Sequence, residues 1–234
     1  MPRLDRFLGK ALAKKRLDVR LLLAQGRVEV DGRRVTDRAR IIDRFSDVRC
    51  DGRTLQARTA RYLMLNKPAG VVSATRDARH RTLIDLLDAP WKDELHIVGR
   101  LDLTSTGLVL LTNDGRWSRA LSLPASKLPK RYRVTVERPL NGGQVEAFRR
   151  GLHFGFENLT TRPAELLILD EFEAEVTLVE GRYHQIRRMF AQVGNQVRDI
   201  HRFAVGPLRL EPGLASGASR ELSTAEVAAL ARGA

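Results

Sequence analysis

The chain has 234 residues, 43% hydrophobic and 29% charged, so it can bury one large core or two smaller ones. Its 41 Lys and Arg residues outnumber 28 Asp and Glu residues, and the net charge of +13 predicts a polyanionic partner, either nucleic acid or anionic lipid. The sequence has no run of ~20 apolar residues and no apolar core near its N-terminus, so we expect neither a membrane span nor a signal peptide. Cys50 is the single cysteine, which excludes an internal disulfide. We therefore expect a cytoplasmic protein that binds nucleic acid and no membrane.

The N-terminal quarter carries most of the excess charge. Residues 1–61 contain 17 Lys and Arg against 8 Asp and Glu. Apolar residues with helical spacing predict a first helix over residues 4–12, and a second is expected to start at a capping Asp18 and end at Gly26. Two Asp-Gly hairpins follow, in "VEVDGRRV" and "VRCDGRTL", with Cys50 as a core residue of the second.

This basic module has two interpretations: a solvated charged face, or a nucleic-acid surface, which the high charge on a clear apolar pattern favours. Its residues "RLDRFLGKALAKKRLDVRLLLAQGRVEVDGRRV" resemble an S4 RNA-binding domain, in the leading R-L-D-x-F-L and in Q-G-R-V-x-V-D-G. The resemblance implies phosphate contacts to folded RNA. The expected RNA-binding residues are Arg3, Arg6, Lys14, Lys15, Arg16, Arg20 and Arg27.

The rest of the chain mixes strands and helices without a βαβ alternation. We place the domain boundary in the polar stretch "QARTAR", giving domains 1–58 and 59–234. Strands are expected at 62–65 and 108–112 and within "KRYRVTVE", "EAEVTLVEG" and "PLRLEPG"; helices are expected within "TLIDLLDAP", "NGGQVEAFRRGL", "RYHQIRRMFAQVG" and after a Ser223–Glu226 capping box. Turns are expected at 66–70 and 113–115. The fold class is α+β: a small α/β module, then a domain built on a mainly antiparallel sheet.

Few kinds of chemistry are open to these residues. The five histidines show no metal-binding spacing, and there is no phosphate-binding glycine loop and no nucleophile elbow, so we expect no metal and no cofactor. The remaining candidate is Asp102, in "GRLDLTSTGLVLLTNDG". It has three possible roles: a backbone cap, an ion-pair partner of Arg100, or a nucleophile in a groove; the local sequence by itself favours the structural roles.

Four blocks in order decide between these roles: Y-L-M-L-N-K-P-A-G, G-R-L-D-x-x-x-T-G-L-x-L-L-T-N-D-G, K-x-Y and E-G-R-Y-H-Q-I-R-R-M-F. Together they resemble the pseudouridine synthases, in the branch that modifies small-subunit ribosomal RNA. The resemblance implies that Asp102 is the nucleophile, that Tyr132 stacks on a flipped-out uridine, and that Arg187 pairs with Asp102 and keeps it ionised. Without it, Tyr132 would be a core residue of its strand and Arg187 a surface cation.

The same resemblance suggests the substrate-binding residues. Arg100, Ile186, Lys67, Lys130 and Arg188 would line the base pocket or bind phosphate, although Lys67 could equally be a solvated charge and Ile186 a core residue. Thr104 departs from the family, which more often has an acidic residue there, and Arg187 replaces a lysine common in this branch.

The implied reaction converts a uridine of 16S ribosomal RNA, of the uridine-516 type, to pseudouridine. The block "YHQ" favours this branch over relatives that modify 23S ribosomal RNA. Modification of 23S ribosomal RNA and a non-catalytic role as a ribosome-assembly factor stay open as alternatives. The expected partner is ribosomal RNA or a subunit-assembly intermediate, bound by a monomer.

Overall fold

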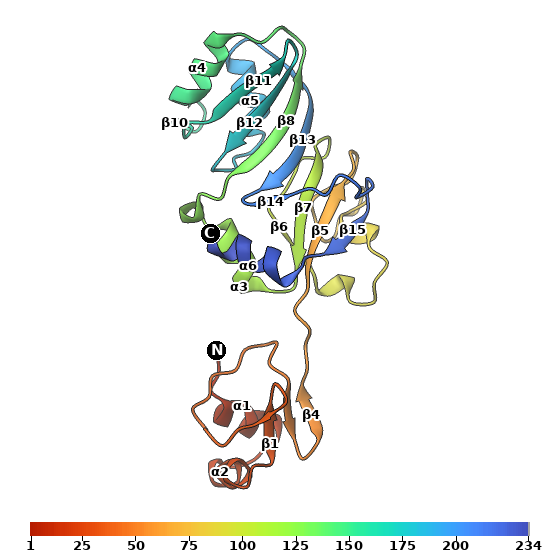
Figure 1. Ribbon diagram of the computed structural model, residues 1–234, viewed down its shortest axis with the longest axis vertical. Coiled ribbons are helices and arrows are strands. Elements are labelled where there is room, and N and C mark those ends of the chain that lie inside the picture. The colour runs from red at the N-terminus through yellow and green to blue at the C-terminus, as the bar shows by residue number, and fades with distance from the viewer. Residues whose placement is uncertain (234) are drawn as a thin grey trace. The chain divides into compact units, whose positions relative to one another are not determined.

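The computed structural model describes residues 1–233, except for the side chain of Pro124. The chain forms two compact units, the first from Met1 to Ala60 and the second from Arg61 onward (Figure 1). Each unit has a hydrophobic core of its own. The helices within residues 1–233 are too short or too polar to span a bilayer.

The first unit packs two helices against an antiparallel sheet with the strand order β2-β1-β3-β4. Its elements are α1 (Leu4–Ala11), α2 (Arg16–Ala24), β1 (Val28–Val30), β2 (Arg33–Arg34), β3 (Val48–Cys50) and β4 (Arg53–Gln56). Both hairpins are confirmed: Asp31-Gly32 joins β1 to β2 and Asp51-Gly52 joins β3 to β4, all four residues with the positive φ of a type I′ turn. Cys50 is buried in this core.

Helix α2 begins two residues before its predicted cap. Lys15 occupies the cap position, with extended backbone and no side-chain hydrogen bond. Asp18 therefore lies in the first turn, where its negative charge favours the positive end of the helix dipole. The end of the helix is as predicted, because Gly26 follows it with φ +65°.

The second unit is built on a nine-stranded sheet, in which β11-β12-β8-β13-β7-β5-β15 are neighbours and β14 and β6 pair with β13 and β7. The strands of this sheet are β5 (Tyr62–Lys67), β6 (His96–Val98), β7 (Thr106–Thr112), β8 (Lys130–Val136), β11 (Glu165–Asp170), β12 (Glu173–Leu178), β13 (Val197–Val205), β14 (Leu208–Arg209) and β15 (Ser219–Glu221). All pairs are antiparallel except β13 with β7, so the mainly antiparallel α+β fold is confirmed.

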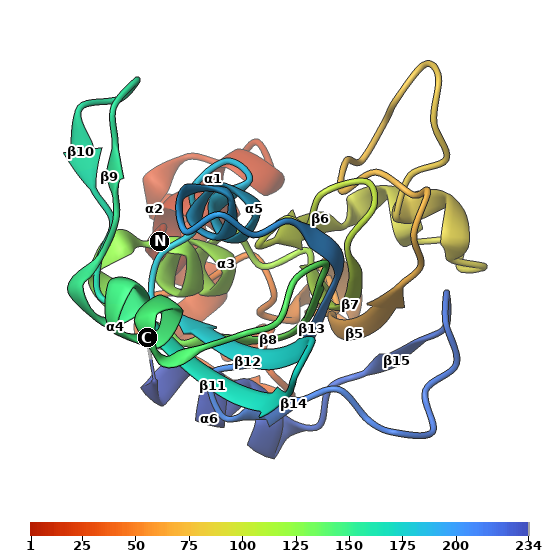
Figure 2. The same cartoon turned by 90° about the horizontal axis from the view of Figure 1, so that it is seen from above.

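Helices cover both faces of this sheet. They are α3 (Gly115–Ser122), α4 (Gly142–Arg150), α5 (Gln185–Gln192) and α6 (Thr224–Arg232); a hairpin of β9 (His153–Phe154) and β10 (Leu159–Thr160) and the 3₁₀ turns η1 (Ile84–Leu86), η2 (Lys92–Glu94) and η3 (Pro124–Ser126) complete the unit. In β7, Val109 and Leu111 join the core beneath α4 and α5, while Leu108 and Leu110 join the core beneath α3 and α6. This alternation is that of a strand buried on both sides, and Figure 2 shows α5 and α6 on opposite sides of the sheet.

Strand β7 changes its neighbour partway along one edge. Near its start, Thr106 and Gly107 pair with β13; near its end, residues 110–112 pair with β6. On the other edge, β5 pairs with β7 along its whole length. The connection from β6 to β7, residues 99–105, therefore begins and ends where the sheet forks, and it carries Asp102.

Several expected elements differ from those observed. The helix expected in "TLIDLLDAP" is only the 3₁₀ turn η1, and strand β5 continues to Lys67, which the sequence had placed in a turn. The expected turn at 113–115 starts helix α3, because Asp114 caps it through the backbone N–H groups of Arg116 and Trp117. The capping box of Ser223 and Glu226 is confirmed. Strands β11 and β13 were not predicted.

Candidate active site

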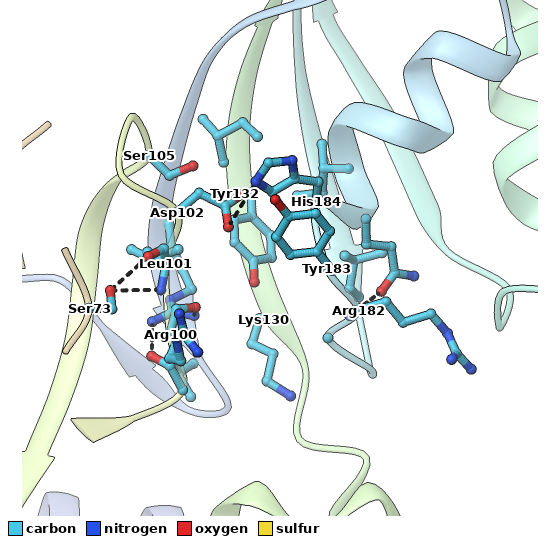
Figure 3. Close-up of a pocket in the computed structure, with 18 of the residues that line it drawn as sticks. Ser73, Arg100, Leu101, Asp102, Ser105, Lys130, Tyr132, Arg182, Tyr183 and His184 are labelled. Carbon is cyan, nitrogen blue, oxygen red and sulfur yellow. Dashed lines mark hydrogen bonds and ion pairs between the residues drawn. The ribbon is translucent and has the colours of Figure 1, made fainter. Parts of the chain in front are cut away.

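A pocket of about 670 Å³ opens at the sheet fork. Its walls come from the β6–β7 connection, the start of β8, the segment from Gly181 to Ile186, and β13 (Figure 3). Asp102 and Tyr132 both line it, so the structure brings together the two residues that the sequence placed at the reacting base. A volume of this size is within the range of small-molecule sites.

The backbone on either side of Asp102 is held by a buried lysine. Lys67, at the end of β5, is fully buried, and its ammonium donates to the carbonyls of Pro68 (3.0 Å), Leu103 (3.1 Å) and Ser105 (2.7 Å). Burial lowers the pKa of Lys67 to about 8, and the negative charge of Asp102 opposes this shift. Lys67 is thus neither solvated nor at the pocket surface, and its expected contact with substrate phosphate is wrong: its donors are used inside the protein.

A serine fixes the residue before Asp102. The Ser73 hydroxyl donates to the Leu101 carbonyl (2.7 Å) and accepts from the Leu101 N–H (3.0 Å), a reciprocal pair visible in Figure 3. The N–H of Gly70 donates to the Leu103 carbonyl (2.9 Å). Residues on both sides of Asp102 are therefore tied to the body of the second unit.

Arg202, on β13, closes the sheet fork. Its side chain is 2% exposed, and its guanidinium donates to the carbonyls of Leu108 (2.7 Å), Arg100 (3.3 Å) and Gly99 (3.0 Å). The Leu108 carbonyl lies in the part of β7 between its β13 partner and its β6 partner, and the other two carbonyls lie in the connecting loop. Arg202 therefore supplies hydrogen-bond donors to backbone carbonyls that have no strand partner on this side. It also adds a positive charge to the pocket wall.

The Asp102 carboxylate is free of structural bonds. Among the described residues no backbone N–H donates to it and no arginine lies within 4 Å, so it is neither a cap nor an ion-pair partner of Arg100. Among the described residues it has one cationic or potentially cationic neighbour within 4 Å, His184, whose Nε2 lies 3.7 Å from Oδ1. The side chain is 35% exposed. An accessible carboxylate on a firmly held backbone, open to a pocket, is suited to act on a bound molecule.

Other predicted residues line the same pocket. Tyr132, on β8, is 8% exposed, and Ile186, at the start of α5, is 5% exposed. Lys130 opens β8, and burial together with the charge of Arg202 lowers its pKa. Arg100 is exposed at the pocket. The pocket therefore combines an aromatic ring, an aliphatic wall and cations around one carboxylate.

Arg187 does not pair with Asp102. Its guanidinium donates instead to the Thr104 hydroxyl (3.0 Å) and to the Val197 carbonyl (2.8 Å). Thr104 lies two residues after Asp102, in the same β6–β7 connection. Arg187 consequently supports the loop that carries Asp102, and the expected ion pair is wrong for this structure because the guanidinium is directed to other acceptors.

Arg188 is also engaged elsewhere. It forms a two-pronged ion pair with Glu157 (Nη1–Oε1 2.7 Å), and its guanidinium lies 3.8 Å from the ring centroid of Phe154. It does not line the pocket. The sequence had suggested that Arg188 binds phosphate. Because both of its terminal guanidinium nitrogens are paired with a carboxylate, it is poorly placed to do so.

The predicted cations of the first unit divide into two groups. Arg3 is paired with Asp5 (2.7 Å), and Arg27 with Asp51 (2.6 Å). The other five are exposed and have no ion pair within the part of the chain that is described: Arg6, Lys14, Lys15, Arg16 and Arg20. Four of these five lie between residue 14 and residue 20, at the entry to α2 and in its first turns.

Sequence reasoning missed the roles of three residues at this site: Lys67, Ser73 and Arg202. All three act on the backbone of the β6–β7 connection, and all are buried polar residues. Only Lys67 gave a signal, as a charged residue in the N-K-P-A-G block. Within residues 1–233, no group of three or more His, Cys, Asp and Glu side chains is arranged to hold a metal ion.

The fold and this pocket define a class of RNA-modifying enzyme. The model of the RNA pseudouridylate synthase family matches residues 61–192, and the chain belongs to that family. A Pseudomonas aeruginosa protein named ribosomal small subunit pseudouridine synthase A is 49% identical over 226 residues, which cover 96% of this chain and 98% of the relative. A protein of the same name from Escherichia coli is 40% identical over 229 residues, covering 97% and 99%. A crystal structure of a pseudouridylate synthase is similar at TM-score 0.72 and 34% identity, covering 98% of this chain and 100% of that one.

Proposed function

We propose that the protein isomerises one uridine of small-subunit 16S ribosomal RNA to pseudouridine, with Asp102 as the nucleophile. The names of the full-length relatives support the substrate, because two of them are ribosomal small subunit pseudouridine synthases at 40% and 49% identity. The observation that carries the role of Asp102 is its carboxylate: it is accessible, lacks structural hydrogen bonds and lies in the pocket.

The reaction balances without a cofactor. The bond from ribose C1′ to uracil N1 breaks and a bond from C1′ to C5 forms, while C5 loses a proton and N1 gains one. No electron is supplied or removed. Asp102 serves as the attacking group that holds one fragment while the uracil turns, at either the ribose or the ring. The ties on residues 101–105 hold this carboxylate in place before the RNA binds.

The uridine must leave its helix to reach Asp102. Tyr132 provides a flat, buried ring in the pocket wall on which the extruded uracil can stack, and Ile186 packs against the base edge. Arg100 and Lys130 line the same pocket as cations that attract the phosphates of the extruded nucleotide.

The first unit holds the RNA. Its hairpins and helices fit the S4 resemblance, and four of its predicted cations, Lys14, Lys15, Arg16 and Arg20, are exposed without an ion pair around the start of α2. Contacts from such a surface go mostly to phosphates, so they anchor folded RNA without reading its sequence. We infer that a monomer acts on 16S ribosomal RNA or on an assembly intermediate that contains it.

The test uses 16S and 23S ribosomal RNA transcripts, each with and without ribosomal proteins, and maps pseudouridine by chemical derivatisation. We expect one modified position in 16S RNA. Asp102→Asn is expected to bind RNA nearly as well as the wild type and to form no pseudouridine, whereas Asp93→Asn, a matched change at an exposed acid outside the pocket, retains activity.

The outcomes separate the alternatives. Modification of 23S RNA alone would replace the proposed substrate. Binding without modification of either RNA would favour an assembly factor. Pseudouridine formation by Asp102→Asn would contradict the assignment of Asp102 as the nucleophile.

A further inference from the structure

Two stacked aromatic rings form part of the pocket wall. The ring centroids of Tyr183 and His184 are 3.9 Å apart, and their planes differ by 15°. The His184 ring reaches Asp102, with Nε2 3.7 Å from Oδ1, and Tyr183 lies beyond it (Figure 3). Both residues line the pocket, yet Tyr183 is 77% exposed.

The turn that carries Tyr183 is fixed by hydrogen bonds. The N–H of Arg182 donates to Gln185 Oε1 (3.0 Å), and the N–H of Gln185 donates back to the Arg182 carbonyl (3.2 Å). Gln185 is 4% exposed, and its Nε2 donates to Glu180 (2.7 Å). The phenol is therefore presented to solvent by a held backbone.

A large ring exposed in this way has one free face. His184 covers the other face, so the phenol ring of Tyr183 offers its free face to a molecule bound at the pocket. In a chain of net charge +13 the partner with flat faces is a nucleobase. Aromatic rings beside cations are the usual stacking surfaces for unpaired bases in nucleic-acid-binding proteins.

We propose that Tyr183 is the stacking surface for the nucleobase next to the uridine that enters the pocket. The proposal rests on the proposed function, since it requires an extruded uridine. When that uridine leaves the helix, its neighbour loses a stacking partner, and the free face of Tyr183 replaces it. The stack then runs from the neighbouring base through Tyr183 to His184, whose edge faces Asp102. Stacking does not depend on base identity, so any of the four bases is accepted.

The experiment removes the neighbouring base instead of the protein side chain alone. A fragment of the transcript that the wild type modifies is prepared intact, with an abasic site 5′ of the target, and with one 3′ of it. Equilibrium binding is measured in the Asp102→Asn background. We expect one abasic site to raise Kd about 10-fold with Tyr183 present and less than about 2-fold with Tyr183→Leu.

Two further variants act as controls. Tyr183→Phe keeps the ring and is expected to keep most of the abasic penalty. Phe156→Leu removes another exposed aromatic ring, which is 99% exposed and outside the pocket wall. This variant is expected to show the same abasic-site increase in Kd as the protein with Tyr183 and Phe156 intact. With 2-aminopurine at the neighbouring position, fluorescence is expected to be more strongly quenched with Tyr183 or Phe there than with Leu.

The results distinguish this proposal from the proposed function. An equal drop in affinity for intact and abasic RNA in Tyr183→Leu, at both positions, means that Tyr183 only supports His184 and overturns the stacking role while modification by the wild type stands. If the wild type forms no pseudouridine in either transcript, the proposed function fails and this proposal fails with it.

Discussion

Asp102 is positioned through its backbone and not through its own carboxylate. Lys67 donates to the carbonyls of Leu103 and Ser105, and Ser73 bonds both polar groups of Leu101. A carboxylate fixed by its own hydrogen bonds would be a weaker nucleophile, because each donor stabilises the charge that must attack. Holding the neighbouring residues leaves the carboxylate oxygens of Asp102 free for the attack that we propose.

Replacing Lys67 tests this arrangement. Lys67→Met keeps the length and apolar stem but removes the ammonium from three buried carbonyls. We expect the free energy of unfolding to fall by about 2 kcal/mol or more, since buried acceptors lose their donor. We also expect the single-turnover rate to fall at least about 10-fold, because the loop then holds Asp102 less accurately. Urea denaturation and rapid-quench assays measure the two effects.

Lys92→Met is the matched control for this change. Lys92 also donates to a backbone carbonyl, that of Leu87 (3.2 Å), but away from the pocket wall. It is expected to leave the rate unchanged. A Lys67→Met protein that is less stable but reacts at the wild-type rate would show that Lys67 does not place Asp102.

At this scale the sequence identified residues better than their hydrogen-bond partners. Asp102, Tyr132, Ile186, Arg100 and Lys130 all line the pocket, because motif blocks specify which side chains meet. The same blocks do not show which acceptor a long side chain binds. The predicted ion pair of Arg187 with Asp102 was therefore wrong, because Arg187 donates to Thr104 and Val197 instead.

At the scale of elements, the fork in strand β7 creates the site. Gly107 lies where β13 meets β7 in parallel, with φ +102°. A Cβ at this position would lie 2.3 Å from the carbonyl oxygen of Arg202 and 2.8 Å from its nitrogen. The two strands can approach closely enough for Arg202 to bridge the fork only because residue 107 has no side chain.

Gly107→Ala is therefore expected to separate β13 from β7. The clash with backbone and the positive φ together predict a loss of about 3 kcal/mol or more in unfolding free energy. Gly213→Ala is the control, since a Cβ there meets nothing within 4 Å, and it is expected to change stability by less than about 0.5 kcal/mol. Equal stability of the two variants in urea denaturation would contradict the close approach.

Elements with local signals were predictable, and those that depend on distant partners were not. The Asp-Gly hairpins, the Ser223 capping box and the glycine ends of α2 and α4 follow from residues a few positions apart. Strand β13 has polar residues such as Asp199 and Arg202 and no alternation, and its partners β7 and β8 lie more than 50 residues away in sequence. Its central place in the sheet is a tertiary property.

At the scale of the whole molecule, the excess of positive charge and the candidate active site lie in different units. Residues 1–60 hold 16 of the 41 basic residues but only 8 of the 28 acidic ones, whereas the pocket with Asp102 lies entirely in the second unit. Such a division predicts that affinity for RNA and the rate of the chemical step respond to different substitutions.

The four cations at the start of α2 offer the test of that division. Replacing Lys14, Lys15, Arg16 and Arg20 together with glutamine removes side chains that have no ion pair in the described structure, so the fold is expected to keep its stability. We expect weaker RNA binding and a slope of log K against log salt that is shallower by about 0.7 to 0.9 for each phosphate that these side chains no longer neutralise. At saturating RNA the single-turnover rate is expected to remain close to that of the wild type, because the pocket is untouched. An unchanged salt slope would show that this surface does not meet phosphate, and a reduced rate at saturation would show that the first unit also orients the uridine.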